Sequence, residues 1–133
     1  MKVALIFGIH LILLSVILFS CSGTSSSQVN QSDNTIYFTP SVLTLSQGER
    51  AEVALEISGL NVPILGMSFQ IICDSTVITF TDLPKVGDFL NQEALSFVSK
   101  SRSIIHMSIT KIQGEKSVSG SGIICIVPFI GVA

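Results

Sequence analysis

The segment Glu52–Ser58 reads EVALEIS, and it decides the fold class of this 133-residue chain. Three apolar residues, Val53, Leu55 and Ile57, alternate there with two glutamates and an alanine. Successive side chains of an extended strand point to opposite faces, so strict alternation predicts a strand with one buried and one solvated face. The segment is therefore expected to belong to a sheet that covers a core on one side only.

Short apolar runs separated by turn residues continue on both sides of this segment. The expected strands, in chain order, are Thr35–Thr39, Glu52–Ser58, Leu65–Cys73, Val77–Phe80, Ala94–Ser99, Ile104–Thr110 and Ile123–Ile130. Gly59–Pro63 is expected to end one strand, and Gly114–Gly122 to form a loop. Pro128 fits an edge strand or a bulge. No helical periodicity is sustained after residue 21, so the pattern predicts an all-β, antiparallel β-sandwich.

The first 21 residues follow a different pattern. Lys2 precedes an apolar run from Val3 to Phe19, which is typical of a secretory signal peptide. The run is close to the length of a transmembrane helix, so an uncleaved anchor is the alternative. Its end, Leu18-Phe19-Ser20-Cys21, resembles the lipobox of bacterial lipoproteins. By that resemblance Cys21 becomes the new N-terminus and carries fatty acids such as palmitate.

The chain after Cys21 divides into a linker and a domain. Residues 22–34 are small and polar, which predicts a flexible Ser-rich linker. Residues 35–133 are enough for one small domain. The predicted location is the cell envelope, on the exported side of a membrane that holds the lipid. Ser22, in place of an aspartate, favours the outer membrane in a bacterium with two membranes.

Charge and composition argue against several classes of function. The net charge of −2 becomes −3 without the signal, because Lys2 is the one charged residue removed. The absence of basic clusters gives no indication of nucleic-acid binding. His106 is the only histidine after the signal, and no familiar nucleophile or zinc motif occurs. Asp74 and Asp82 alone are too few for calcium. We therefore predict no catalytic residues, no metal site and no cofactor.

Five segments occur in an order and spacing that resemble a cohesin domain. They are GERAEVALEISGL (48–60), LGMSFQIICDSTVITF (65–80), VGDFL (86–90), IIHMSI (104–109) and GSGIICIVPF (120–129). The resemblance covers residues 47–129. It implies a jelly-roll-like sandwich of the carbohydrate-binding-module superfamily, and a non-catalytic module that binds a dockerin-like protein partner. Polysaccharide binding is the alternative. The chain has no tryptophan and one tyrosine, Tyr37, and its later phenylalanines mostly occupy expected core positions.

The resemblance also implies a docking face and an incomplete end. In cohesins the docking surface uses outward residues of the strand matching 66–74 and of the hairpin matching 94–110. The corresponding residues here, none of them a carboxylate, are Ser68, Gln70, Ile72, His106 and Ser108. Cohesins continue past the G-x-G strand with one or two further strands, which this chain lacks. A truncated reading frame is the simplest explanation, and a natural minimal domain or a partner's strand in the gap are the others.

Two cysteines remain after Cys21, and the sequence leaves their state open. Cys73 and Cys125 fall on inward positions of strands that the resemblance places in opposite sheets. A disulfide between them would close a loop of about fifty residues and contribute roughly 3–4 kcal/mol. Two buried free thiols are the alternative.

Overall fold

The computed structural model describes the strand Gly8–His10 and residues 34–133, and these residues form strands, turns and loops without a helix. The strands are β1 (Gly8–His10), β2 (Thr35–Thr39), β3 (Arg50–Ile64), β4 (Gly66–Ile72), β5 (Ile78–Phe80), β6 (Lys85–Val86), β7 (Leu95–Lys100), β8 (Ile104–Thr110) and β9 (Val118–Gly131). No helix long and apolar enough to cross a membrane occurs in this part of the chain. The expected lipidation site Cys21 and linker residues 22–33 lie outside the described residues.

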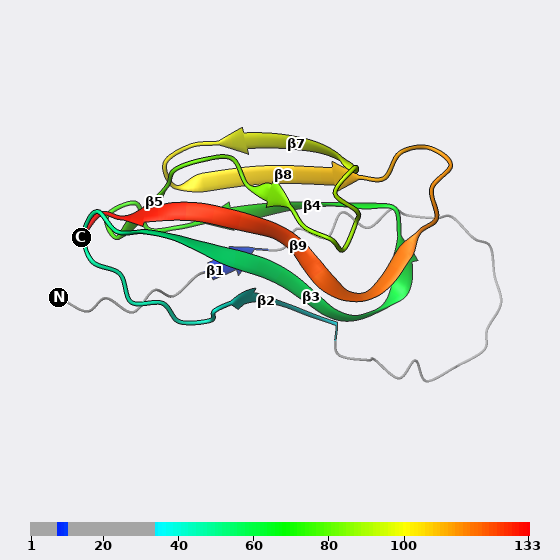
Figure 1. Ribbon diagram of the computed structural model, residues 1–133, viewed down its shortest axis with the longest axis horizontal. Coiled ribbons are helices and arrows are strands. Elements are labelled where there is room, and N and C mark those ends of the chain that lie inside the picture. The colour runs from blue at the N-terminus through cyan, green and yellow to red at the C-terminus, as the bar shows by residue number, and fades with distance from the viewer. Residues whose placement is uncertain (1–7, 11–33) are drawn as a thin grey trace.

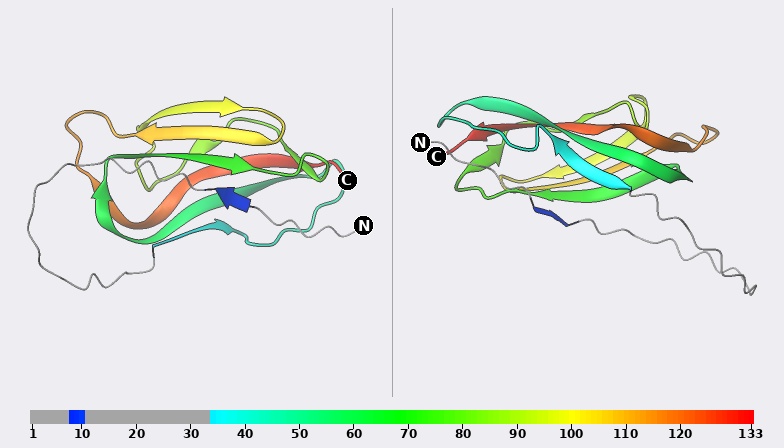
Figure 2. Two further views of the ribbon diagram at one scale, coloured as in Figure 1. Left: turned by 180° about the vertical axis from the view of Figure 1, so that it is seen from behind. Right: turned by 90° about the horizontal axis from the view of Figure 1, so that it is seen from below.

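The strands form two sheets that face one another (Figures 1 and 2). One sheet has the order β1-β4-β8-β7, and the other has the order β2-β3-β9-β5, with β6 also pairing with β9. Every pair is antiparallel. The expected all-β, antiparallel sandwich is thus confirmed.

The pairing of β3 with β9 is the longest in the molecule and differs from the expected strand bounds. β3 continues past Gly59 to Ile64, and β9 starts at Val118 rather than Ile123. Register shifts occur after Leu55 and on both sides of Leu60. Bulges of this kind insert extra residues without ending a strand. Gly59–Pro63 therefore bends the strand instead of terminating it.

Pro128 lies on an inner strand, because β9 pairs with β3 on one side and with β5 and β6 on the other. β5 ends opposite Phe129, and β6 begins opposite Ile126. Pro128 falls between these two short partners, and its carbonyl accepts a hydrogen bond from the Thr81 N–H (3.2 Å). A proline at this gap removes no ladder hydrogen bond, which is why an inner strand tolerates it.

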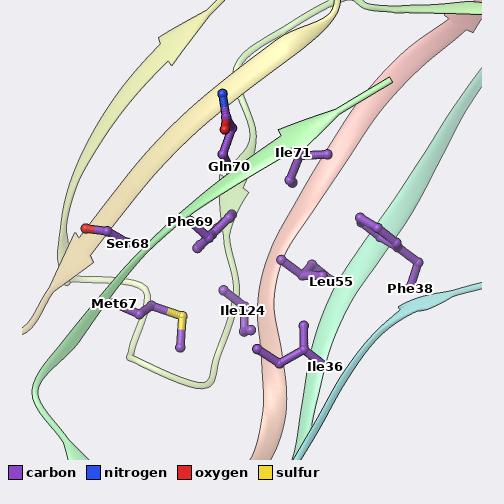
Figure 3. Close-up of a pocket in the computed structure, with 9 residues that line it drawn as sticks. All are labelled: Ile36, Phe38, Leu55, Met67, Ser68, Phe69, Gln70, Ile71 and Ile124. Carbon is purple, nitrogen blue, oxygen red and sulfur yellow. The ribbon is translucent and has the colours of Figure 1, made fainter. Parts of the chain in front are cut away.

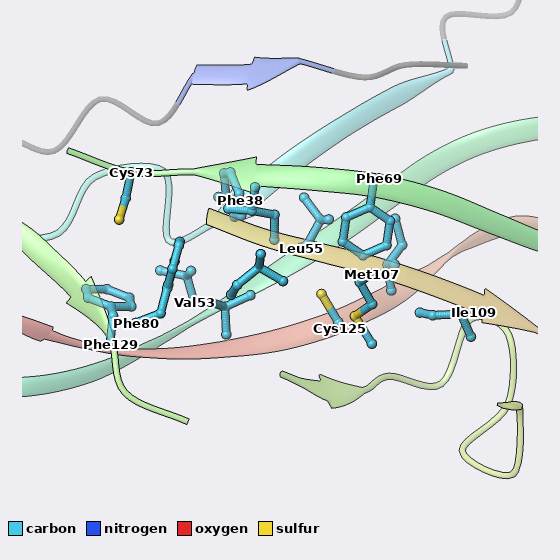
Figure 4. Packing of buried hydrophobic residues seen from close by; sticks show 14 of the residues in the cluster. Phe38, Val53, Leu55, Phe69, Cys73, Phe80, Met107, Ile109, Cys125 and Phe129 are labelled. Carbon is cyan, nitrogen blue, oxygen red and sulfur yellow. The ribbon is translucent and has the colours of Figure 1, made fainter. Parts of the chain in front are cut away.

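The core fills the space between the sheets, as Figure 4 shows. Val53, Leu55 and Ile57 of β3 are buried, as the alternation of EVALEIS predicts. The opposite sheet contributes alternate residues of β4 and β8, whose buried members are Phe69, Ile71, Ile105, Met107 and Ile109. Within residues 34–133, every buried hydrophobic residue belongs to the range 38–129. These residues supply apolar side chains from both sheets.

The segment Gly87–Phe89 attaches the loop after β6 to β9. The N–H groups of Gly87 and Phe89 donate to the carbonyls of Ile124 (2.8 Å) and Ile123 (2.9 Å). In return, the Asp88 Oδ1 accepts the N–H of Ile123 (2.8 Å). A Cβ atom on Gly87 would collide with the carbonyl oxygen of Ile123. Only glycine lets the two backbones approach this closely.

We predict that Gly87→Ala destabilises the domain by about 2–3 kcal/mol, because the added methyl group forces the two backbones apart. Urea unfolding followed by circular dichroism measures this change. Ser119→Ala, at an exposed position of the same β9 strand, is the control and should remain within about 0.5 kcal/mol of wild type. Equal midpoints for the two variants would show that the close approach at Gly87 is unimportant.

Candidate functional site

The outer face of the four-stranded sheet carries all five residues that the sequence assigns to a docking surface. Met67, Phe69 and Ile71 of β4 face the core, so the alternate residues of this strand face outward. β8 obeys the same rule around buried Ile105 and Met107. The outward residues are exposed or half-buried: Ser68, Gln70, Ile72, His106 and Ser108.

Two cross-strand hydrogen bonds connect four of these side chains. Ser68 lies opposite Ser108, and their hydroxyl oxygens are 2.7 Å apart. Gln70 lies opposite His106, and its Nε2 is 3.2 Å from the His106 Nε2. Side chains directly opposite in an antiparallel pair are close enough for such contacts. The pairs form a polar row across β4 and β8 that is held in place before any ligand arrives.

β7 adds two large apolar residues that the sequence analysis did not assign to this face. Phe97 lies opposite Ser108, and Leu95 lies opposite Thr110, so both share the outer face. Phe97 is 68% exposed and Leu95 is 52% exposed. The phenylalanines after the signal were expected to lie mostly in the core, and Phe97 is the exposed exception. Its alternation with Val98, which packs against the core, is the signal that could have identified it.

The face has little catalytic chemistry. No aspartate, glutamate, lysine or arginine lies among the outward residues of β4, β7 and β8. Within the described residues, His106 hydrogen-bonds to an amide and not to a hydroxyl nucleophile. The described chain also contains no cluster of three or more metal-ligating side chains. Asp74 accepts hydrogen bonds from Thr76, and Asp82 faces Arg50 at 3.8 Å, so these two acids have separate partners.

Cys73 and Cys125 are free, buried thiols, so the disulfide that the sequence left open is not formed. Cys73 follows β4, and its Sγ lies 3.6 Å from the carbonyl oxygen of Ile78. Cys125 lies on β9 opposite Leu55. Figure 4 shows the two sulfur atoms at different places in the core. The cysteines contribute to packing on opposite sheets, not to a covalent link between them.

A second feature lies at the open side of the sandwich, between β2 and β4. A small, partly open apolar pocket, with a cavity volume of about 30 Å³, is lined by residues of both sheets. Ile36 and Phe38 of β2 lie on one side, and Met67 and Phe69 of β4 lie on the other (Figure 3). Ile124, the extra residue at the β9 bulge, is part of the lining. Sequence reasoning did not identify this pocket, because it depends on which strands end at the edges of the sheets.

The fold is similar to those of two solved structures. One is a non-cellulosomal cohesin from the hyperthermophilic archaeon Archaeoglobus fulgidus, with a TM-score of 0.58 and 18% identity over 74% of this chain. The chain has a cohesin-like fold. The other is a cohesin, CaCohA2, in complex with the dockerin CaDoc0917, with a TM-score of 0.51 and 23% identity over 65% of this chain.

This cohesin-like chain spans about two thirds of the length of each neighbour, 65% and 64%. No protein-family model and no curated protein sequence matches it. The five sequence segments therefore predict the cohesin-like fold, although the sequence identity to both solved structures is low.

We predict that the two thiols make stability fall above pH 9. Burial raises the pKa of Cys125 to about 12. Burial and the Asp74 charge raise the pKa of Cys73 to about 11. The thiols of the unfolded chain ionise near pH 9. Their contribution to the free energy of unfolding is therefore complete below that pH, and it is lost as the pH rises towards the pKa values of the folded state. Urea unfolding should show a loss of about 1 kcal/mol per thiol at pH 10 relative to pH 8.

The control is the variant with both Cys73→Ala and Cys125→Ala. Its stability should fall less between pH 8 and pH 10, because only the other groups that titrate at alkaline pH remain. Iodoacetamide at pH 8 should leave both thiols of the native domain unmodified and label both after unfolding. A mass two hydrogens lighter, with no label after unfolding without reductant, would instead demonstrate a disulfide.

Proposed function

We propose that this chain is a non-catalytic docking module, anchored to a membrane by a lipid on Cys21, whose outer β4–β8–β7 face binds a protein partner. The observation that carries the proposal is exposed Phe97 beside a preformed polar row on an uncharged face. The partner we propose is a dockerin-like module. The lipid anchor and the docking face are separate parts of the proposal and are tested separately.

The composition of the face supports a protein partner. Protein interfaces are depleted of charged residues in their centre and enriched in aromatic residues. Large exposed aromatic and aliphatic side chains contribute most of the binding energy when a partner covers them. Here Phe97 and Leu95 supply apolar area, and the Ser68–Ser108 and Gln70–His106 pairs supply donors and acceptors around it. The fold adds support, because the similar cohesin CaCohA2 forms a complex with the dockerin CaDoc0917.

The arrangement of aromatic residues favours protein over polysaccharide. Tyr37 pairs with Glu56 on the outer face of the other sheet, and its hydroxyl donates to the Glu56 carboxylate (3.0 Å). Phe97 is therefore on the opposite side of the sandwich. The other phenylalanines of the domain, Phe38, Phe69, Phe80, Phe89 and Phe129, are buried. Two exposed aromatic rings on opposite faces do not form one stacking platform for a flat sugar chain.

We predict that Phe97→Lys reduces capture of a dockerin-like partner by about a hundredfold, because a charged side chain would be buried against an apolar surface. The measurement is surface plasmon resonance with immobilised residues 22–133 and dockerin modules encoded in the source genome. Binding should change little between 50 and 500 mM salt, since the face carries no charged residue.

Val42→Lys is the matched control, because Val42 is 66% exposed and lies in the loop after β2, away from the face. This variant should bind like wild type. Equal loss in both variants, or none in Phe97→Lys, would exclude the β4–β8–β7 face. Retardation of the domain in cellulose, xylan or pectin gels that disappears with Phe97→Lys would instead identify a polysaccharide ligand.

The lipid anchor is supported by the residues before Cys21, which resemble a lipobox, and by the small polar residues after it. We predict that expression of the full chain in a bacterium with radiolabelled palmitate labels the protein and places it in the membrane fraction. Cys21→Ser should abolish labelling and leave the unprocessed chain. Ser22→Ala is the control and should be labelled normally. A labelled Cys21→Ser variant would exclude this anchor.

A further inference from the structure

β4 borders the open side of the sandwich and accepts a strand there. On one side it pairs with β8 along its whole length, from Gly66 to Ile72. On the other side, β1 pairs with it only opposite Gln70–Ile72. Among the described strands, none covers Gly66–Phe69 on that side. An edge of this kind presents unpaired backbone groups that pair readily with another extended chain.

The apolar pocket lies directly beside this edge, as Figure 3 shows. Ile36 comes from β2, the edge strand of the other sheet, and Met67 and Phe69 come from β4. Residues directly opposite one another in a strand pair share a face. A strand paired with β4 would therefore direct every second side chain, those opposite Met67, Phe69 and Ile71, towards the pocket. Aliphatic side chains at these alternate positions match its lining.

The segment that pairs with β4 in the structure belongs to the predicted signal peptide. Gly8–His10 pairs in the register Gly8 with Ile72, Ile9 with Ile71 and His10 with Gln70. Cleavage before Cys21 would remove this strand and leave the β4 edge opposite Gln70–Ile72 without it. We infer that the mature domain then binds one extended strand of a partner protein, antiparallel to β4, with aliphatic residues at alternate positions. This inference rests on the proposed cleavage.

A second copy of the chain is a poorer occupant than a partner's strand. β7 is the free edge at the far side of the four-stranded sheet. Its inward positions are Ser96, Val98 and Lys100, which include a hydroxyl and a charge. β2 already directs Ile36 and Phe38 into its own core. β4 of a second copy likewise has its alternate apolar residues turned into its own core. None of these edges therefore has alternating aliphatic residues free for the pocket.

The test uses residues 22–133, which include all the buried hydrophobic residues that the structure describes. The probe is a fluorescent peptide of residues 6–12 (IFGIHLI) with lysines added at both ends for solubility. Its Phe, Ile and Leu alternate, so an extended conformation presents them on one side. Fluorescence anisotropy should show saturable binding at one peptide per domain. Hydrogen exchange should slow in Gly66–Ile72 when the peptide is bound.

Three changes should each weaken this binding by about tenfold or more. A proline in place of Ile9 in the peptide interferes with strand pairing. Met67→Asp places a charge in the apolar pocket. The full chain of residues 1–133, assayed in detergent, already carries Gly8–His10 on the β4 edge. Val62→Asp, at a 61% exposed position of β3 outside the pocket lining, is the matched control and should bind normally.

Several results would overturn the inference. They are equal binding of the proline peptide, protection of β7 instead of β4, full-chain binding as strong as that of residues 22–133, or a dimer of the domain that excludes the peptide. If Met67→Asp fails to fold, the proline peptide and the exchange pattern still decide. Phe97→Lys should leave peptide binding unchanged, so loss of the docking face and loss of this edge site are distinguished. Palmitate labelling tests the cleavage independently.

Discussion

The antiparallel pairing of β3 with β9 is the constraint on which the rest of the structure depends. These strands are 15 and 14 residues long, and they place Val53, Leu55, Val127 and Phe129 on the same inward face. Every other strand of their sheet attaches to one of the two. The bulge at Ile124 bends β9 and lets Gly87 and Phe89 dock on its backbone. Without this pair the second sheet would have nothing to pack against.

The fold could be predicted from the sequence where alternation is strict. EVALEIS and the β4 and β8 segments alternate residue by residue, and burial follows the alternation in all three. The errors occur where a strand continues through residues that usually end one. Gly59–Pro63 and Gly114–Gly122 contain turn-forming residues, but β3 and β9 hold each other extended through part of both segments by cross-strand pairing. Long-range pairing of this kind leaves no local signal.

The candidate site, like the fold, could be predicted only in part. The outward positions of β4 and β8 follow from the alternation of apolar and polar residues, which is enough to identify Ser68, Gln70 and His106. The hydrogen bonds between these side chains depend on the register of β4 against β8, which alternation alone does not determine. Phe97 was missed for another reason. Large aromatic residues are usually buried, so residue type alone does not identify Phe97 as an outward residue of the short edge strand β7.

β4 connects the proposed docking face to the open edge of the sandwich. Its outward side chains belong to the polar row, its inward side chains line the pocket, and its free backbone edge accepts β1. A strand added beside β4 would lengthen the outer face past Gln70 and Ile72 in the direction away from Phe97, because β8 and β7 lie on the other side. The two sites would then be adjacent without sharing a side-chain surface. A partner that supplies both a strand and a surface would gain from their linkage, since its second contact becomes intramolecular once the first has formed.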